Sequence, residues 1–178
     1  MKVQERLLRA TSALRIANIP YAVVGGNAVA SWVGRRDPGA IRHTRDVDIL
    51  VNRGDVSAIK DAMSGAGFVH WNGPGFDVFR DGPEGLPSEG IHLLFANERV
   101  FGDDAALQPD TSESVDMQEF RVVSLEALVR MKLTAFRRKD QVHVLDMIGV
   151  GLVDATWLAN LPPSLAARLK ELLDDPHG

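Results

Sequence analysis

The chain has 178 residues, 45% of them hydrophobic, and a formal net charge of −4 at pH 7. This length and composition predict one globular domain, or a domain with a helical appendage. The chain contains no cysteine, which excludes disulfides, thiolate chemistry and zinc sites built from cysteine. The small negative net charge gives no overall electrostatic reason to bind nucleic acid, although a local basic patch could still bind it.

The sequence shows no targeting segment and no membrane-spanning segment. The charged N-terminus leads into an amphipathic stretch and lacks the apolar centre of a signal peptide. No apolar run is long enough to cross a bilayer. We therefore expect a soluble, cytoplasmic protein without a membrane partner.

Hydrophobic periodicity and turn residues predict alternating helices and strands as far as residue 95. In chain order we expect a helix over 3–18, a strand over 21–24, a helix from residue 27, a strand over 46–51, a helix over 55–66, and strands over 68–71, 76–80 and 91–95. The last two strands are expected to pair as a hairpin with a long loop. Asn27 is the expected N-cap of the second helix.

The pattern beyond residue 95 is first irregular and then helical. Residues 97–118 are polar without a clear period, and 120–123 reads as a last short strand. Ser124 is the expected N-cap of a helix running to about residue 138, and Asp140 the expected cap of a helix over 141–148.

The pattern thus predicts two regions. We expect an α/β core over 1–123 and a C-terminal helical extension over 124–178 that packs on this core and ends in a helix after Pro163.

Two aspartates open the strand over 46–51. Asp46 and Asp48 are two positions apart, so both side chains lie on one face of the strand, about 7 Å apart along it. The apolar residues between and after them, Val47, Ile49 and Val51, then face the core. Two neighbouring carboxylates repel each other unless water or a cation compensates them, and a hard cation held by oxygens is one solution.

Two other features could bind phosphate. Gly25 and Gly26 lie between a strand and a helix, where a ligand can approach the backbone and the helix-start amides favour an anion. The same pair also fits a tight structural turn without a ligand. Lys132 falls in the middle of the apolar face of its helix, so its ammonium must reach solvent, a carboxylate or a bound phosphate. His143 and Asp146 are either core polar groups or partners of Lys132.

The order of these features resembles the nucleotidyltransferase superfamily related to DNA polymerase β. The resemblance lies in the segment 24–28, Val-Gly-Gly-Asn-Ala, and in the segment 42–50, where Arg42, Thr44, Asp46 and Asp48 match the family's Arg-x-Thr-x-Asp-x-Asp arrangement. The segment 124–133 is similar to the family's lysine-bearing helix, and Arg138-Lys139-Asp140 is similar to its Arg-x-Lys-Asp segment. The chain looks most like the small bacterial branch found among abortive-infection and toxin–antitoxin proteins.

The resemblance implies a mixed, twisted sheet flanked by helices, which is an α/β (α+β) fold. The implied activity is transfer of a nucleoside monophosphate from a nucleoside triphosphate to an acceptor hydroxyl on RNA, a protein or a small molecule. Nucleotide binding is implied for Gly25, Gly26, Asn27, Arg42, Thr44 and Lys132, and catalysis with Mg²⁺ or Mn²⁺ binding for Asp46 and Asp48.

One position departs from the family pattern. Active members carry a third carboxylate on a neighbouring strand, and here that position holds His92. Histidine binds magnesium poorly and suits manganese or zinc better, and it could also act as a base. Asp77 and Glu89 are alternative third ligands.

If no residue completes the metal site, the alternative is a non-catalytic nucleotide-binding module, or a partner in a toxin–antitoxin pair, with the same fold. A third, purely structural interpretation has solvated aspartates and a glycine turn without a ligand.

Overall fold

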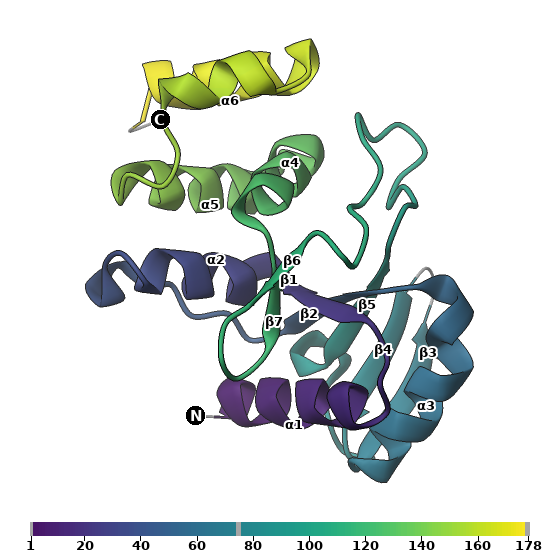
Figure 1. Cartoon of the computed structure of the whole chain (residues 1–178). Coiled ribbons are helices and arrows are strands. Elements are labelled where there is room, and N and C mark those ends of the chain that lie inside the picture. Colours follow the sequence, from purple (N-terminus) through teal and green to yellow (C-terminus); the bar gives the residue numbers. More distant parts are fainter. Residues whose placement is uncertain (1, 74–75, 177–178) are drawn as a thin grey trace.

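The computed structural model describes residues 2–73 and 76–176. It is a seven-stranded mixed sheet with helices on both faces (Figure 1), as the sequence predicted. The helices are α1 (Lys2–Ile16), α2 (Gly25–Gly34), α3 (Val56–Gly65), α4 (Leu125–Ala135), α5 (Arg138–Gly149) and α6 (Pro163–Asp174). The strands are β1 (Tyr21–Val24), β2 (Val47–Val51), β3 (Phe68–Gly73), β4 (Phe76–Asp81), β5 (Ile91–Phe95), β6 (Ser114–Asp116) and β7 (Arg121–Val123). None of the helices described combines the length and the apolar character needed to cross a membrane.

The sheet has the strand order β3-β4-β5-β2-β1-β7-β6. Strand β2 lies at its centre, antiparallel to β1 and parallel to β5. Strands β4 and β5 pair antiparallel, which confirms the expected hairpin. The apolar residues of β1 and β2 are fully or almost fully buried, because helices cover both faces of the central strands.

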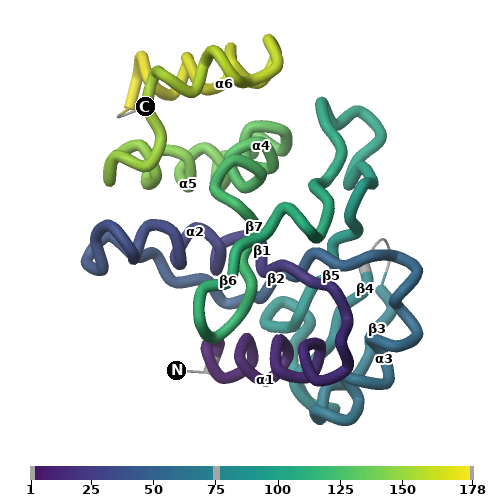
Figure 2. The backbone as a smooth tube through the Cα atoms, viewed as in Figure 1, coloured from purple at the N-terminus to yellow at the C-terminus, as the bar shows by residue number. Residues whose placement is uncertain are grey.

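The helices form layers that bring the C-terminal part of the chain over α2. Helices α1 and α3 lie on one face of the sheet, and α2 lies on the other, with α4 and α5 above it and α6 outermost (Figure 1). The two ends of the chain therefore lie at opposite ends of this stack (Figure 2). One cluster of buried side chains runs through all the layers, from Leu7 of α1 to Leu169 of α6.

The structure corrects two expected helix caps and one irregular segment. Helix α2 begins at Gly25, directly after Val24, because Gly25 adopts a positive φ of 64° that turns the chain into the helix. Asn27 is therefore not the N-cap. Helix α5 begins at Arg138, so Asp140 lies inside it, although the Asp140 carboxylate still accepts a hydrogen bond from the preceding backbone N–H of Arg137. The segment 97–118 contains strand β6.

Helix α6 completes the end of α4. The chain leaves α4 at Phe136, in the left-handed conformation with φ 47°, whereas Ser124 caps the start of the helix as predicted. Arg168 of α6 donates hydrogen bonds of 2.7 Å to the carbonyl oxygens of both Leu133 and Thr134, and its guanidinium lies 5.1 Å from the centroid of the Phe136 ring. The last carbonyls of α4, which a helix leaves unpaired, are thus satisfied from α6.

Candidate active site

A straight row of residues crosses five neighbouring strands. The strand registers place Val24 opposite Asp48, Asp48 opposite His92, His92 opposite Val78 and Val78 opposite Trp71. Residues that are directly opposite each other on paired strands share a face of the sheet. We call this row, Val24–Asp48–His92–Val78–Trp71, the site row.

The site row forms one side of a cavity of about 570 Å³. The last four residues of the row line this cavity, and so do residues of α4 and α5. The C-terminal helices therefore cover part of the sheet face that carries Asp48.

Asp46, Asp48 and His92 form a compact group. One ligand atom from each residue lies within 4.8 Å of the other two, and this is the only such group of three found within 2–73 and 76–176. A single ion with bonds of about 2.1 Å can draw together atoms over such a spread. The residues present thus fit a divalent cation with two carboxylates and one imidazole.

The surroundings of His92 decide which nitrogen faces this group. Its Nε2 lies 2.9 Å from the carbonyl oxygen of Pro87, and because a carbonyl only accepts, Nε2 must carry the hydrogen. Its Nδ1 lies 3.6 Å from Oδ1 of Asp48. In the neutral imidazole the lone pair of Nδ1 therefore points into the group, the arrangement that orients metal-binding histidines.

The charges of the group support one another. The carboxylate of Asp48, whose Oδ1 lies 3.6 Å from Nδ1, raises the pKa of His92 above its ordinary value because it stabilises the imidazolium, against the opposing effect of partial burial. Burial opposes ionisation of Asp46, but hydrogen bonds from Thr44 and from its own backbone, with the nearby charges of His92 and Lys139, hold its pKa below the ordinary value. Asp46 is therefore an ionised carboxylate at neutral pH.

The backbone of the glycine turn lies directly against these carboxylates. A Cβ atom added to Gly25 would lie within 3.0 Å of the side-chain atoms of Asp48, and one added to Gly26 would lie 3.1 Å from Cβ of Thr44. The positive φ of Gly25 disfavours a side chain as well. Only glycine lets the start of α2 approach Asp48 this closely.

Cationic side chains from α4, α5 and their connection line the same cavity. These are Lys132, Arg137 and Lys139. Lys132 is only 6% exposed, and its Nζ lies 3.1 Å from Oδ1 of Asp140, which is 1% exposed. Although burial opposes ionisation of Asp140, the ammonium of Lys132 and the hydrogen bond from Arg137 hold its pKa below the ordinary value. The carboxylate that pairs with Lys132 is thus Asp140, whereas Asp146 forms a 2.7 Å ion pair with Arg42.

Three residues that line the cavity carry buried polar atoms that have no hydrogen-bond partner among the described residues. These atoms are Oε1 of Gln108, Oγ1 of Thr134 and Nδ1 of His143. Burial, with the nearby charge of Lys132, lowers the pKa of His143 to about 4, so this imidazole is neutral at pH 7. Buried polar atoms without partners are costly unless a ligand or water satisfies them.

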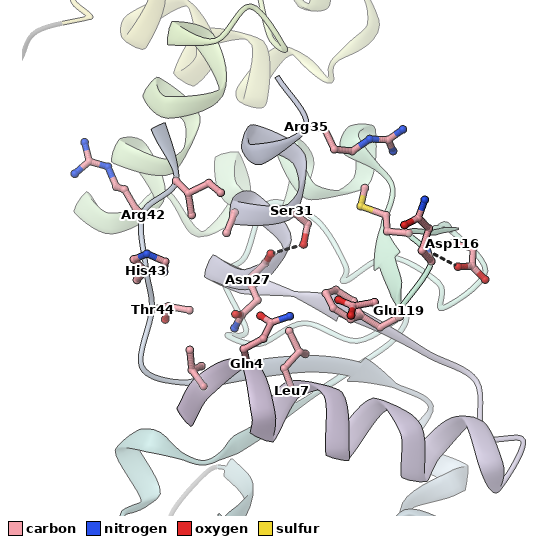
Figure 3. Close-up of a pocket in the computed structure, with 16 residues that line it drawn as sticks. Gln4, Leu7, Asn27, Ser31, Arg35, Arg42, His43, Thr44, Asp116 and Glu119 are labelled. Atoms are coloured by element: carbon pink, nitrogen blue, oxygen red, sulfur yellow. Dashed lines mark hydrogen bonds between the residues drawn. The ribbon is translucent and has the colours of Figure 1, made fainter. Parts of the chain in front are cut away.

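The structure does not bring all the predicted site residues together. Gly25, Gly26, Thr44, Asp46, Asp48, His92 and Lys132 line the cavity, whereas Asn27 and Arg42 line a second cavity of about 550 Å³ between α1, α2 and the β6–β7 turn (Figure 3). The two cavities share Thr44 and its neighbour His43. Asn27 instead donates a 2.9 Å hydrogen bond to the carbonyl oxygen of Asp46, which holds the backbone just before β2.

Neither alternative third ligand belongs to the group of Asp46, Asp48 and His92. Asp77 precedes Val78 on β4, so strand alternation directs it to the opposite face of the sheet, where it contacts His70 at 2.9 Å. Glu89 ends a short 3-10 turn, Pro87–Glu89, before β5.

Several lining residues carried no usable signal in the sequence. Trp71 and Gln108 come from a strand and a loop that reach the cavity only through the pairing of distant segments. By contrast, Arg137 directly precedes the Arg138-Lys139-Asp140 segment and Lys139 lies within it, so this segment could have indicated their position next to Lys132.

No protein-family model matches the sequence, and no curated protein matches it either. Solved structures do match its fold. They include ANT(2″)-Ia in complex with adenylyl-2″-tobramycin (TM-score 0.58, 15% identity, 96% of this chain and 97% of that chain covered). JHP933 from Helicobacter pylori also matches (0.55, 16%, 98% and 74%), as does an antigenic nucleotidyltransferase-like protein from Paracoccidioides brasiliensis (0.53, 16%, 95% and 87%). The chain therefore has a nucleotidyltransferase-like fold, a mixed sheet flanked by helices.

Proposed function

We propose that the protein is a metal-dependent nucleotidyltransferase that transfers a nucleoside monophosphate from a nucleoside triphosphate to an acceptor hydroxyl. One observation carries the proposal: the glycine turn, the group Asp46–Asp48–His92 and the buried Lys132 line one cavity. The fold supports it, since ANT(2″)-Ia has been solved with adenylyl-2″-tobramycin, an adenylylated compound.

The chain's own groups supply binding and orientation. The backbone of Gly25 lies against Asp48 and that of Gly26 against Thr44, so both would contact phosphates bound at this group. Lys132, Arg137 and Lys139 would balance the charge of these phosphates. Asp46, Asp48 and His92 would hold Mg²⁺ or Mn²⁺. When bound, the ion neutralises the phosphates and makes the acceptor hydroxyl more acidic.

The reaction forms one bond and breaks another at the α-phosphorus. The acceptor oxygen bonds to this phosphorus while the bond to the oxygen bridging the α- and β-phosphates breaks, and pyrophosphate leaves. The proton of the hydroxyl passes to a carboxylate of the aspartate pair. Most of the catalysis comes from positioning and charge stabilisation, as in phosphoryl transfer generally.

The test is transfer of an α-³²P-labelled nucleotide to a cell extract, with each of the four triphosphates and with Mg²⁺ or Mn²⁺. We expect Asp48→Asn to reduce transfer by about 100-fold or more, because a charge that stabilises the transition state is lost. Asp61→Asn, an exposed aspartate on α3, is the matched control and should transfer normally. Equal transfer by Asp48→Asn, or no transfer by the unaltered protein under any condition, would contradict the proposal.

Membership of the abortive-infection and toxin–antitoxin branch, and a protein partner of that kind, remain predictions from the sequence. Tight binding of a triphosphate without any transfer would instead favour a non-catalytic nucleotide-binding module.

A further inference from the structure

The group Asp46–Asp48–His92 divides the cavity along the site row. On one side lie the glycine turn after β1 and the cationic side chains of α4 and α5. These two helices pack on α2. On the other side the row continues over β4 and β3, through Val78 and Trp71. The long β5–β6 connection rises next to this second half (Figure 1).

In-line displacement at phosphorus puts the nucleophile and the leaving group on opposite sides. If pyrophosphate leaves toward Gly25 and the cations, the acceptor hydroxyl must approach from the side of β5, β4 and β3. This step rests on the proposed function. It assigns the half of the cavity near Trp71 to the acceptor.

Trp71 has the position of a stacking platform. It lines the cavity with 37% of its surface exposed, and it is directly opposite the buried Val78. Its ring lies against Gly73, where an added Cβ would come within 3.0 Å of three ring atoms. The missing side chain at Gly73 therefore makes room for the indole in this orientation.

The β5–β6 connection completes this half of the cavity. Val100 and Phe101 line it, and they are 41% and 53% exposed. The carboxylate of Asp104 accepts hydrogen bonds from their backbone N–H groups, at 3.1 and 2.9 Å, which orders the loop. Gln108, which is 7% exposed, also lines this half of the cavity.

We propose that Trp71, Val78, Val100, Phe101 and Gln108 form an acceptor subsite for a neutral small molecule that carries its hydroxyl on a ring. The ring stacks on the indole and packs against the apolar side chains, and Gln108 lines the same half of the cavity. Asp104 is the one carboxylate that the structure describes in this half of the cavity, and its Oδ2 already accepts hydrogen bonds from two backbone amides. This single, partly engaged carboxylate supplies less negative charge than a polycationic acceptor needs.

Nucleosides and glycosides share this chemistry, and the emission of Trp71 can distinguish them. Of the three tryptophans, Trp32 and Trp157 are replaced by phenylalanine, which leaves Trp71 as the reporter. The protein is saturated with Mn²⁺ and a non-hydrolysable triphosphate analogue, and then titrated with adenosine, phenyl β-D-glucoside or tobramycin. We expect a saturable change in emission with one of the two neutral compounds and none with tobramycin.

Calorimetry with the same ligands separates this subsite from the nucleotide site. In the otherwise unaltered chain, Trp71→Ala should weaken binding of the neutral compound by about tenfold and leave the affinity for the triphosphate analogue within about twofold. Leu86→Ala, an exposed leucine that does not line the cavity, is the matched control and should bind both ligands normally.

Three results would overturn the subsite. The first is a full emission change with the triphosphate analogue alone, which would assign Trp71 to binding of the nucleobase. The second is preferential binding of tobramycin. The third is no saturable emission change with either neutral compound. If the triphosphate analogue itself fails to bind, the proposed function fails first. If it binds and the neutral compounds do not, only the acceptor subsite fails.

Discussion

His92 lies where strand register puts it next to Asp48, so its chemistry sets the character of the proposed metal site. Its Nε2–H is held by the carbonyl of Pro87, and the remaining nitrogen faces the two carboxylates. Nitrogen ligands favour manganese and the later transition metals over magnesium, which prefers oxygen. The structure thus gives a physical reason to expect a metal preference that differs from that of a three-carboxylate site.

We predict that the protein binds Mn²⁺ more tightly than Mg²⁺, and that His92→Asp reduces this difference by about tenfold. Pulsed electron paramagnetic resonance of bound Mn²⁺ gives a direct readout, because a coordinated imidazole nitrogen produces a ¹⁴N coupling. The coupling should be present in the unaltered protein and absent in His92→Asp. His70→Asp, a change on β3 outside the group, should keep it, and a bound Mn²⁺ without ¹⁴N coupling would contradict the prediction.

Local sequence patterns predicted the strand, the two aspartates and the glycine turn, because alternation and turn chemistry act over a few residues. They could not predict that Lys132 pairs with Asp140, since that depends on how two helices pack after the left-handed turn at Phe136. Trp71 was equally out of reach, because its place in the site row follows from three separate strand registers.

Helices α1 and α2 hold the backbone that leads into β2. Arg6 of α1 is only 6% exposed, and its Nη2 donates a 2.9 Å hydrogen bond to the carbonyl oxygen of Arg45. Asn27 of α2 holds the next carbonyl, that of Asp46, at the same distance. Two consecutive peptide groups before Asp48 are thus fixed by buried side chains, which gives α1 a role in the site beyond packing.

We predict that Arg6→Met weakens Mn²⁺ binding by about tenfold, the scale found for residues that orient metal ligands. The substitution keeps an unbranched side chain but removes the donor to Arg45, and Arg6→Lys should restore part of the affinity. Arg9→Met is the control, because Arg9 lies one turn further along α1, where it pairs with Asp81 and stacks on Phe68. Equal loss of affinity in Arg6→Met and Arg9→Met would mean that α1 acts only through stability.

For the molecule as a whole, the continuous core suggests that sheet and C-terminal helices fold together. Buried residues of α4 and α6 belong to the same cluster as those of α1 and the strands. The boundary at residue 123 between a core and a helical extension remains a prediction. The packing of α4 and α5 on the sheet also places His143 of α5 near four charged side chains. They are Lys132, Lys139, Asp140 and Asp146.

His143 should make the stability of the whole protein depend on pH. Its pKa is about 4 in the folded protein, against an ordinary value of 6.5, so between these values the unfolded chain binds a proton that the folded chain does not. The free energy of unfolding therefore falls as pH drops from 6.5 to 4, by at most about 1.4 kcal/mol per pH unit from this group. Urea unfolding at several pH values in this range gives the free energy of unfolding as a function of pH. This free energy should change less with pH in His143→Gln than in the unaltered protein. His43→Gln, at an exposed histidine, should show the same pH dependence as the unaltered protein.

The hydrogen bonds of Arg168 have a consequence for natural variation in this protein. Its guanidinium donates to two carbonyl oxygens at the end of the helix that carries Lys132, and it also stacks on Phe136. A lysine offers a compact point charge in place of this planar fork, so even a charge-conserving change here would loosen the turn that follows Lys132. Inactive variants should therefore include some whose substitution lies in the outermost helix, far from any residue that a substrate touches.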